Sequence, residues 1–203
     1  ENLGEIKAVA FDIDGTLYKG WHLYRKLPLY FLKNISFFLK YGSARKILRT
    51  DEPVDDFHAL QAECMAQKLG CSCEKASEII NRIVYDGLKP FFERIKPCKN
   101  AYDTVKAFHE AGLKIALLSD FPPEQKGDVW GMKPFCDVIL GAENCGALKP
   151  SPVPFRLLSE KLGVEAENIL YVGNSFKYDV LGSGKVGMKP FCDVILGAEN
   201  CGA

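Results

Sequence analysis

Residues 6–17, with the sequence IKAVAFDIDGTL, constrain the fold of this chain more than any other segment. The run from Ile6 to Phe11 is apolar and is typical of a buried strand of a parallel sheet. It ends at Asp12, and Asp14 follows two residues later, so both carboxylates project from the end of the strand. Ligands of open α/β sheets bind at that edge. A simple polar turn is the alternative, because Asp and Gly are common turn residues.

The chain from residue 100 onward alternates between strand and helix patterns. Strands are predicted at 113–120, 137–141 and 168–173, and helices at 102–111, 152–162 and 180–186. This alternation indicates a parallel sheet with right-handed crossovers.

Residues 18–96 interrupt the α/β pattern and read as all-helical. Apolar residues recur at helical spacing within 21–41, where Pro28 suits a helix start, and helices are predicted at 57–69 and 74–94. We therefore predict an α/β core at 1–17 and 97–203 and an inserted helical cap at 18–96. The basic residues and Pro28 interrupt 21–41 too often for a membrane span. Packing within the cap and lying on a membrane surface both stay open.

Three later segments place polar residues at or after predicted strand ends. Ser119 ends ALLSD, Lys149 lies in LKPSP, and Asn174 and Asp179 lie in YVGNSFKYDV. Each signal is weak alone, because many strands end in Ser and most lysines are solvated. Together they supply the groups that phosphate chemistry requires, since a lysine neutralises anionic oxygens and keeps a neighbouring carboxylate ionised.

In this order the four segments resemble the motifs of the haloacid dehalogenase-like (HAD) hydrolases, of which the first is D-x-D-G-T. The resemblance covers about residues 5–20 and 97–190 and is weak across the cap. It implies a Rossmann-like parallel sheet with a helical cap inserted after the first motif, and it points to the phosphatase branch of the superfamily.

The resemblance also implies catalytic roles for individual residues. Asp12 would be the nucleophile and form an aspartyl-phosphate intermediate. Asp14 would give a proton to the leaving alcohol and then activate water. Ser119 and Lys149 would hold and neutralise the phosphoryl oxygens, and Thr16 would bind substrate through its hydroxyl or backbone N–H.

The same resemblance implies a Mg²⁺ site formed by Asp12, Asp14, Asn174 and Asp179. Asn174 departs from the family pattern, which has an acidic residue there. An amide oxygen ligates Mg²⁺ without adding charge, so we predict weaker metal binding, with Asp179 as a direct ligand or as a partner of the ligands. Some family members that cleave carbon–halogen bonds work without a metal, so Asn174 is also compatible with a dehalogenase.

The function that these residues indicate is a cytoplasmic, Mg²⁺-dependent phosphatase acting on a small phosphorylated metabolite. The alternatives are a 2-haloacid dehalogenase, a phosphosugar mutase, and a non-catalytic binding protein. The 26 basic and 26 acidic residues cancel, so no nucleic-acid partner is expected. Cys71 and Cys73 lack a second pair or a histidine at zinc spacing, which indicates reduced cytosolic thiols. Two roles are compatible with Trp21, His22, Tyr24 and Arg25, which follow the first motif. They contact the substrate, or the aromatic residues pack within the cap and Arg25 is solvated.

The sequence GMKPFCDVILGAENCGA occurs at 131–147 and again, letter for letter, at 187–203. Its length fits no known repeat architecture. Two origins are compatible with the repeated sequence: a duplication, or an error in which the sequence was assembled incorrectly at the shared tripeptide GMK. We expect residues 193–196 to form an edge strand or the tail to be poorly ordered, and we expect no catalytic residue there.

Overall fold

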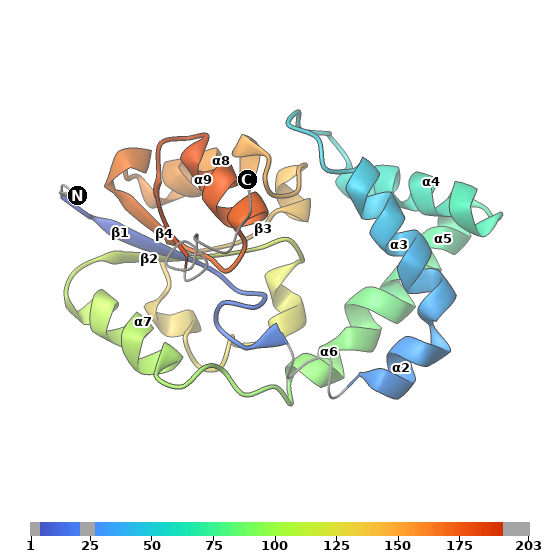
Figure 1. The fold of residues 1–203 in the computed structure, drawn as a ribbon, viewed down its shortest axis with the longest axis horizontal. Helices are drawn as coiled ribbons and strands as arrows, with labels where there is room; N and C mark the ends of the chain where they lie inside the picture. The colour runs from blue at the N-terminus through green and yellow to red at the C-terminus, as the bar shows by residue number, and fades with distance from the viewer. Residues whose placement is uncertain (1–4, 21–26, 193–203) are drawn as a thin grey trace, which may run out of the picture.

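A computed structural model of the chain describes residues 5–20 and 27–192. It contains one parallel five-stranded sheet with the order β3-β2-β1-β4-β5 (Figure 1). The strands are β1 (Ala8–Asp12), β2 (Lys114–Ser119), β3 (Val138–Gly141), β4 (Ile169–Val172) and β5 (Lys189–Phe191). This arrangement confirms the predicted Rossmann-like α/β core.

Helices cover both faces of the sheet, as the alternating side chains of β1 require. On one face Ala8 and Ala10 pack with α8 (Pro152–Leu162) through buried residues such as Phe155. On the other face Val9 and Phe11 pack with α7 (Ala101–Glu110). Both faces of the central strand are therefore buried, which explains its continuous apolar sequence.

The helical cap lies between β1 and α7 in the chain and beside the core in space (Figure 1). The cap has its own hydrophobic core, which includes Phe37, Met65 and Val84. At the N-terminus of helix α4 (Phe57–Leu69), the side chain of the N-cap residue Asp56 accepts a hydrogen bond from the backbone N–H of Ala59. The cap elements are α2 (Pro28–Lys33), α3 (Ile35–Ile47), α4 (Phe57–Leu69), α5 (Cys73–Ile80), the π-helix η1 (Asn81–Tyr85) and α6 (Asp86–Phe92).

Some predicted elements differ from the observed ones. The single helix expected at 74–94 is divided by η1, and the helix expected at 180–186 is the short α9 (Leu181–Gly184), preceded by the π-helix η6 (Phe176–Val180). The other short helices are of the 3₁₀ type: η2 (Pro123–Lys126), η3 (Lys133–Phe135), η4 (Glu143–Cys145) and η5 (Ala166–Asn168).

Two sequence predictions fall on residues that the structure does not describe. Residues 21–26, which include Trp21, His22, Tyr24 and Arg25, and the proposed strand at 193–196 lie outside the described residues. Edge strand β5 uses the start of the second copy of the duplicated sequence. None of the helices within 5–20 and 27–192 has the length and apolar character needed to cross a bilayer.

Candidate active site

The predicted site residues gather at the carboxyl ends of β1, β2 and β4. Asp12 is the last residue of β1, Ser119 is the last residue of β2, and Asn174 lies two residues beyond β4. The neighbouring strands are parallel, so their ends meet at one edge of the sheet. A cavity of about 120 Å³ opens there, lined by Asp12, Asp14, Asp120, Phe121, Lys149, Asn174, Ser175, Tyr178 and Asp179.

Lys149 bridges two carboxylates at the centre of this cavity. Its Nζ lies 2.6 Å from Asp12 Oδ1 and 2.7 Å from Asp179 Oδ1, and all three residues are buried. Burial alone would lower the pKa of Lys149, but the carboxylates, Asp12 first among them, raise that pKa well above its ordinary value. The lysine is therefore a fixed cation beside Asp12.

Asp12 is held by donors on both of its oxygens. Lys149 contacts Oδ1, and the Thr16 hydroxyl donates to Oδ2 across 2.9 Å. Burial raises the pKa of Asp12 to about 7, Asp179 and Asp14 add to the rise, and Lys149 opposes it. The Asp12 carboxylate thus has one orientation at the end of β1, with Oδ1 facing Lys149 and Oδ2 facing Thr16.

Asp14 receives donors from three different parts of the core. The Tyr18 hydroxyl donates to Oδ1 across 2.7 Å, the Ser119 hydroxyl donates to Oδ2, and Lys126 Nζ lies 3.2 Å from Oδ2. Burial would raise the pKa of Asp14, but Lys126 and these hydrogen bonds lower it below its ordinary value. In this arrangement Asp14 is a carboxylate at neutral pH.

The Ser119 hydroxyl faces Asp14 and does not line the 120 Å³ cavity. It also accepts a hydrogen bond from the backbone N–H of Phe121, and Lys126 Nζ lies 3.3 Å away. The expected contact between Ser119 and a phosphoryl group therefore stays a prediction, because it requires this hydroxyl to change partners.

Asn174 lies against the turn that follows the first strand. Gly15 has φ of +100°, and a Cβ on it would lie 2.3 Å from Asn174 Nδ2. Only glycine combines this backbone conformation with so close an approach. The turn therefore brings Asn174 next to the segment that carries Asp12 and Asp14.

Asp179 has no free carboxylate oxygen. Oδ1 accepts from Lys149, and Oδ2 accepts from the backbone N–H of Ser175 across 2.9 Å. Within 5–20 and 27–192, no three His, Cys, Asp or Glu side chains are grouped as metal ligands. Asp12 and Asn174 also line the cavity, and carboxylate and amide oxygens are ligands that Mg²⁺ accepts, while the Asp12 oxygens have Lys149 and Thr16 as their partners here.

Sequence reasoning missed Lys126, Tyr18 and Arg49. Arg49 comes from the cap, pairs with Asp120 Oδ2 at 2.7 Å, donates to the backbone carbonyl of Lys149, and lies over the ring of Tyr178. Asp120 also accepts from the backbone N–H of Lys149. Lys126 and Arg49 reach the site only through the packing of elements distant in the sequence, whereas the contact of Tyr18 with Asp14 is local.

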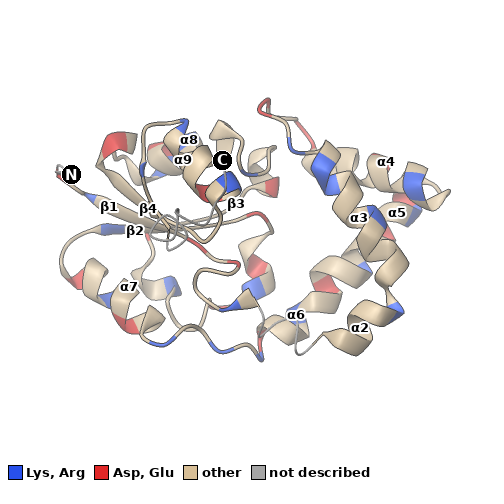
Figure 2. Cartoon of the chain, in the orientation of Figure 1, with Lys and Arg blue, Asp and Glu red and all other residues tan. Residues whose placement is uncertain are grey.

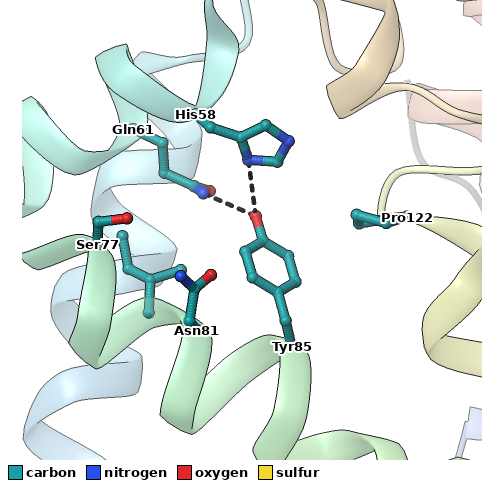
Figure 3. Close-up of a pocket in the computed structure, with 7 residues that line it drawn as sticks. His58, Gln61, Ser77, Asn81, Tyr85 and Pro122 are labelled. Atoms are coloured by element: carbon teal, nitrogen blue, oxygen red, sulfur yellow. Dashed lines mark hydrogen bonds between the residues drawn. The ribbon is translucent and has the colours of Figure 1, made fainter.

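The cap is tied to the core by a second polar cluster. Arg45 pairs with the fully buried Glu143, and the Tyr85 hydroxyl donates to Glu143 across 2.7 Å. Gln61 donates to the same hydroxyl, and the His58 ring lies beside it (Figure 3). A cavity of about 300 Å³ adjoins this cluster, lined by His58, Gln61, Ser77, Ile80, Asn81, Tyr85 and Pro122.

Charged residues of both signs are interspersed over the cap and the core (Figure 2). Several of the acidic residues, such as Asp12, Asp120 and Glu143, pair with lysine or arginine.

Known proteins with similar sequences and structures are hydrolases. The family model described as haloacid dehalogenase-like hydrolase matches residues 6–187. Pyrophosphatase PpaX of Halalkalibacterium halodurans is 29% identical over 191 residues, covering 91% of this chain and 82% of that protein. Haloacetate dehalogenase H-2 of Moraxella sp. is 25% identical over 196 residues, covering 90% and 83%. The magnesium-bound HAD hydrolase YfnB of Bacillus subtilis has a TM-score of 0.63 at 15% identity, covering 92% and 87%.

Proposed function

Because this chain belongs to the haloacid dehalogenase-like hydrolase family, we propose that it hydrolyses a small phosphomonoester through an aspartyl-phosphate on Asp12. One observation carries the proposal. Asp12 ends β1 against the buried cation of Lys149, and Asp14, whose carboxylate is held by three donors, lines the same cavity. A nucleophile, a cation for anionic oxygens and a proton carrier are the parts that phosphoryl transfer requires.

In the first step an Asp12 oxygen forms a bond to phosphorus while the bond from phosphorus to the substrate's alcohol oxygen breaks. Asp14 gives its proton to that oxygen. In the second step Asp14 takes a proton from water, the water oxygen attacks phosphorus, and inorganic phosphate leaves Asp12. Lys149 neutralises the phosphoryl oxygens in both steps, and Asp179 and Thr16 keep Lys149 and Asp12 in position.

The two steps need different protonation states of Asp14. Its three donors, Tyr18, Ser119 and Lys126, favour the ionised form. The arrangement described here therefore suits the second step, in which Asp14 acts as a base. For the first step the carboxyl group must hold a proton, which a substrate phosphate that draws Ser119 away from Asp14 would favour.

A bound Mg²⁺ would neutralise phosphoryl charge and fix the geometry of transfer. We propose that Asp12, Asn174 and the backbone carbonyl of Asp14 hold it. Asp179, named above as a ligand or as a partner of the ligands, is proposed as the partner that holds Lys149, because its Oδ1 accepts a hydrogen bond from Lys149 Nζ. We also propose a cytoplasmic location, which the free cysteines among the described residues support, because disulfides are rare in the cytosol.

The proposal is tested by phosphate release from a panel of small phosphomonoesters, with Mg²⁺ and with chelator. Wild-type activity that disappears in Asp12→Asn and in chelator is the expected result. Retained activity in Asp12→Asn would overturn the assigned nucleophile. Activity that is unaffected by the chelator would overturn the metal requirement alone.

Dehalogenation is the second candidate, and Asn174 is the observation that favours it. An amide in place of an acid lowers the negative charge available for a metal. Haloacetate dehalogenase H-2 shows that similar sequences serve this reaction in another organism. Halide release from a 2-haloacid, independent of Mg²⁺ and accompanied by no phosphate release from the panel, would replace the phosphatase proposal.

A further inference from the structure

A second cavity adjoins the predicted phosphoryl site. Its volume is about 420 Å³, within the range of small-molecule sites. It shares Asp14, Phe121 and Asn174 with the 120 Å³ cavity, so a group bound there would lie next to the reacting atoms. The remaining described lining residues are Gly15, Tyr18, Gly20, Leu27, Phe31, Phe38, Leu88, Phe92 and Gln125.

This cavity has aromatic and aliphatic walls from both the cap and the core. Phe31 and Phe38 of the cap stack with ring centroids 4.8 Å apart and planes 11° apart. Phe92 ends the last cap helix, and Tyr18 packs edge-on against it. Phe31 lines the cavity and keeps 40% of its surface exposed.

Asp14 is the one charged residue among the described lining residues. A sugar or a second phosphate would require several hydrogen-bonding or cationic partners. Lys126, the nearest buried cation in the described core, is already engaged by Asp14 and Ser119 and is covered by the ring of Phe92. The aromatic and aliphatic side chains that make up most of the described lining favour an apolar group.

Gln125 lines this cavity and carries a buried acceptor without a partner among the described residues. The residue is 5% exposed, and its amide nitrogen donates to the backbone carbonyls of Val84 and Tyr85 across 2.6 Å and 3.3 Å. Its Oε1 is buried and has no partner among the described residues. A buried acceptor without a partner is costly, so it would be satisfied by a donor on a bound ligand.

We propose that this cavity binds the leaving alcohol of the substrate, and that this alcohol carries an aromatic group with one hydrogen-bond donor that reaches Gln125. The inference rests on the proposed phosphatase activity and names its substrate class. When the phosphorus–oxygen bond breaks, the proton from Asp14 stays on the alcohol, which then leaves from the apolar cavity while the phosphoryl group stays on Asp12.

The test compares phosphate esters of primary alcohols, because their leaving groups have similar intrinsic reactivity. The substrates are 2-phenylethyl phosphate, its 4-hydroxyphenyl analogue, glycerol 3-phosphate and glucose 6-phosphate. We expect kcat/KM to be at least about tenfold higher for the two aromatic esters, and highest for the one with the hydroxyl. A preference for glycerol or glucose phosphate would overturn the inference and leave the phosphatase proposal standing.

Two variants of α2 distinguish an effect on the cavity from an effect on the stability of the protein. Phe31→Ala removes a lining ring and is expected to lower kcat/KM for the aromatic esters but not for glycerol 3-phosphate. Leu29→Ala is the matched control, because Leu29 lies on the same helix, is 82% exposed and does not line the cavity. Equal effects of both variants on all substrates would contradict the assigned role of the cavity.

A binding measurement keeps the inference testable if no ester is hydrolysed. Calorimetry with Asp12→Asn would compare 2-phenylethylphosphonate with methylphosphonate, which lacks the ring. Tighter binding of the aromatic phosphonate, lost in Phe31→Ala, would support the cavity even though the phosphatase proposal had failed. Equal binding, or no binding of either compound, would overturn the inference.

Discussion

Lys126 and Asp14 form an ion pair within the site, with Nζ 3.2 Å from Oδ2 and the lysine side chain fully buried. The lysine is in η2 of the core, more than a hundred residues away in the sequence, and it contacts Ser119 as well. The charge state of the proposed acid–base residue therefore depends on a cation outside the four sequence motifs.

Replacing Lys126 with Met is predicted to raise the pKa of Asp14, because the cation that favours the carboxylate is lost. The first step needs protonated Asp14, so the alkaline limb of the kcat/KM profile should move to higher pH. Lys126→Arg, which keeps the charge, should leave the limb near its wild-type position. An unchanged limb in Lys126→Met would show that Lys126 does not control this proton.

Asn174→Asp is predicted to strengthen Mg²⁺ binding, because it adds a negative charge without changing the size of the side chain. The half-maximal Mg²⁺ concentration should fall by about tenfold, or about 1.4 kcal/mol. Calorimetry gives the same comparison without turnover. Asn100→Asp, which adds the same charge at the start of α7, is the control. Unchanged or weaker metal binding would remove Asn174 from the metal site.

Gly15→Ala is predicted to lower activity, because the new Cβ would lie 2.3 Å from Asn174 Nδ2 and would displace the side chain proposed above as a metal ligand. Gly112→Ala is a matched control. Gly112 also has a positive φ, of +82°, but a Cβ there would meet nothing within 4 Å. Both variants should lose about 1 kcal/mol of stability from the backbone conformation, measured by urea unfolding. Only Gly15→Ala should lower phosphate release, and equal activity in the two variants would contradict the steric argument.

Glu143→Gln is predicted to destabilise the protein by about 3–5 kcal/mol, because it leaves the buried charge of Arg45 without its main partner. The exposed pair of Lys75 and Glu78 provides the comparison, since Glu78→Gln should cost less than about 1 kcal/mol. Combining Glu143→Gln with Arg45→Met should recover part of the loss. Urea unfolding measures all three, and similar losses for the buried and exposed pairs would refute the prediction.

Asp120 is predicted to contribute stability that depends on pH. Burial would raise its pKa, but Arg45, Arg49 and Lys149 lower it below the ordinary value. A carboxyl group with a lowered pKa stabilises the folded state above its unfolded pKa, and this contribution is lost as the pH falls through the folded pKa. Wild type should therefore exceed Asp120→Asn in stability at pH 7.

The difference in unfolding free energy between these two proteins should narrow below about pH 4, the ordinary value for Asp. Urea unfolding across this range gives the measurement. Asp55→Asn, at an exposed position of the cap loop, controls for the general effect of removing a carboxylate. A difference that stayed constant with pH would show that the Asp120 charge is not the source of its stabilisation.

Local sequence determined much of the core and part of the cap. The helices predicted at 57–69 and 152–162 have those bounds in the structure, because their caps are encoded beside them: Asp56 and Gly70 for α4, and Ser151 and Gly163 for α8. The strand ends that carry Asp12 and Ser119 were also predictable, because an apolar run that stops at a polar residue marks the edge of a parallel sheet.

Long-range contacts were not predictable in this way. Lys126 and Arg49 reach the site from a 3₁₀ helix and from the cap, and nothing in their neighbourhood distinguishes them from solvated residues. The local sequence also did not predict that η1 interrupts the helix expected at 74–94. Its Tyr85 side chain is held by Glu143 of the core, and that contact does not exist in the isolated segment.

The duplicated sequence shows most directly what tertiary structure decides. Lys133–Phe135 forms a 3₁₀ helix, whereas the identical Lys189–Phe191 forms strand β5. In the first copy Phe135 packs against Tyr102 and His109 of α7. In the second copy the segment lies beside β4, and Phe191 accepts a hydrogen bond from the backbone of Gly173. Three residues are too few to fix their own conformation, so the sequence set what these residues can form, and the available backbone and side-chain partners selected which form they adopt.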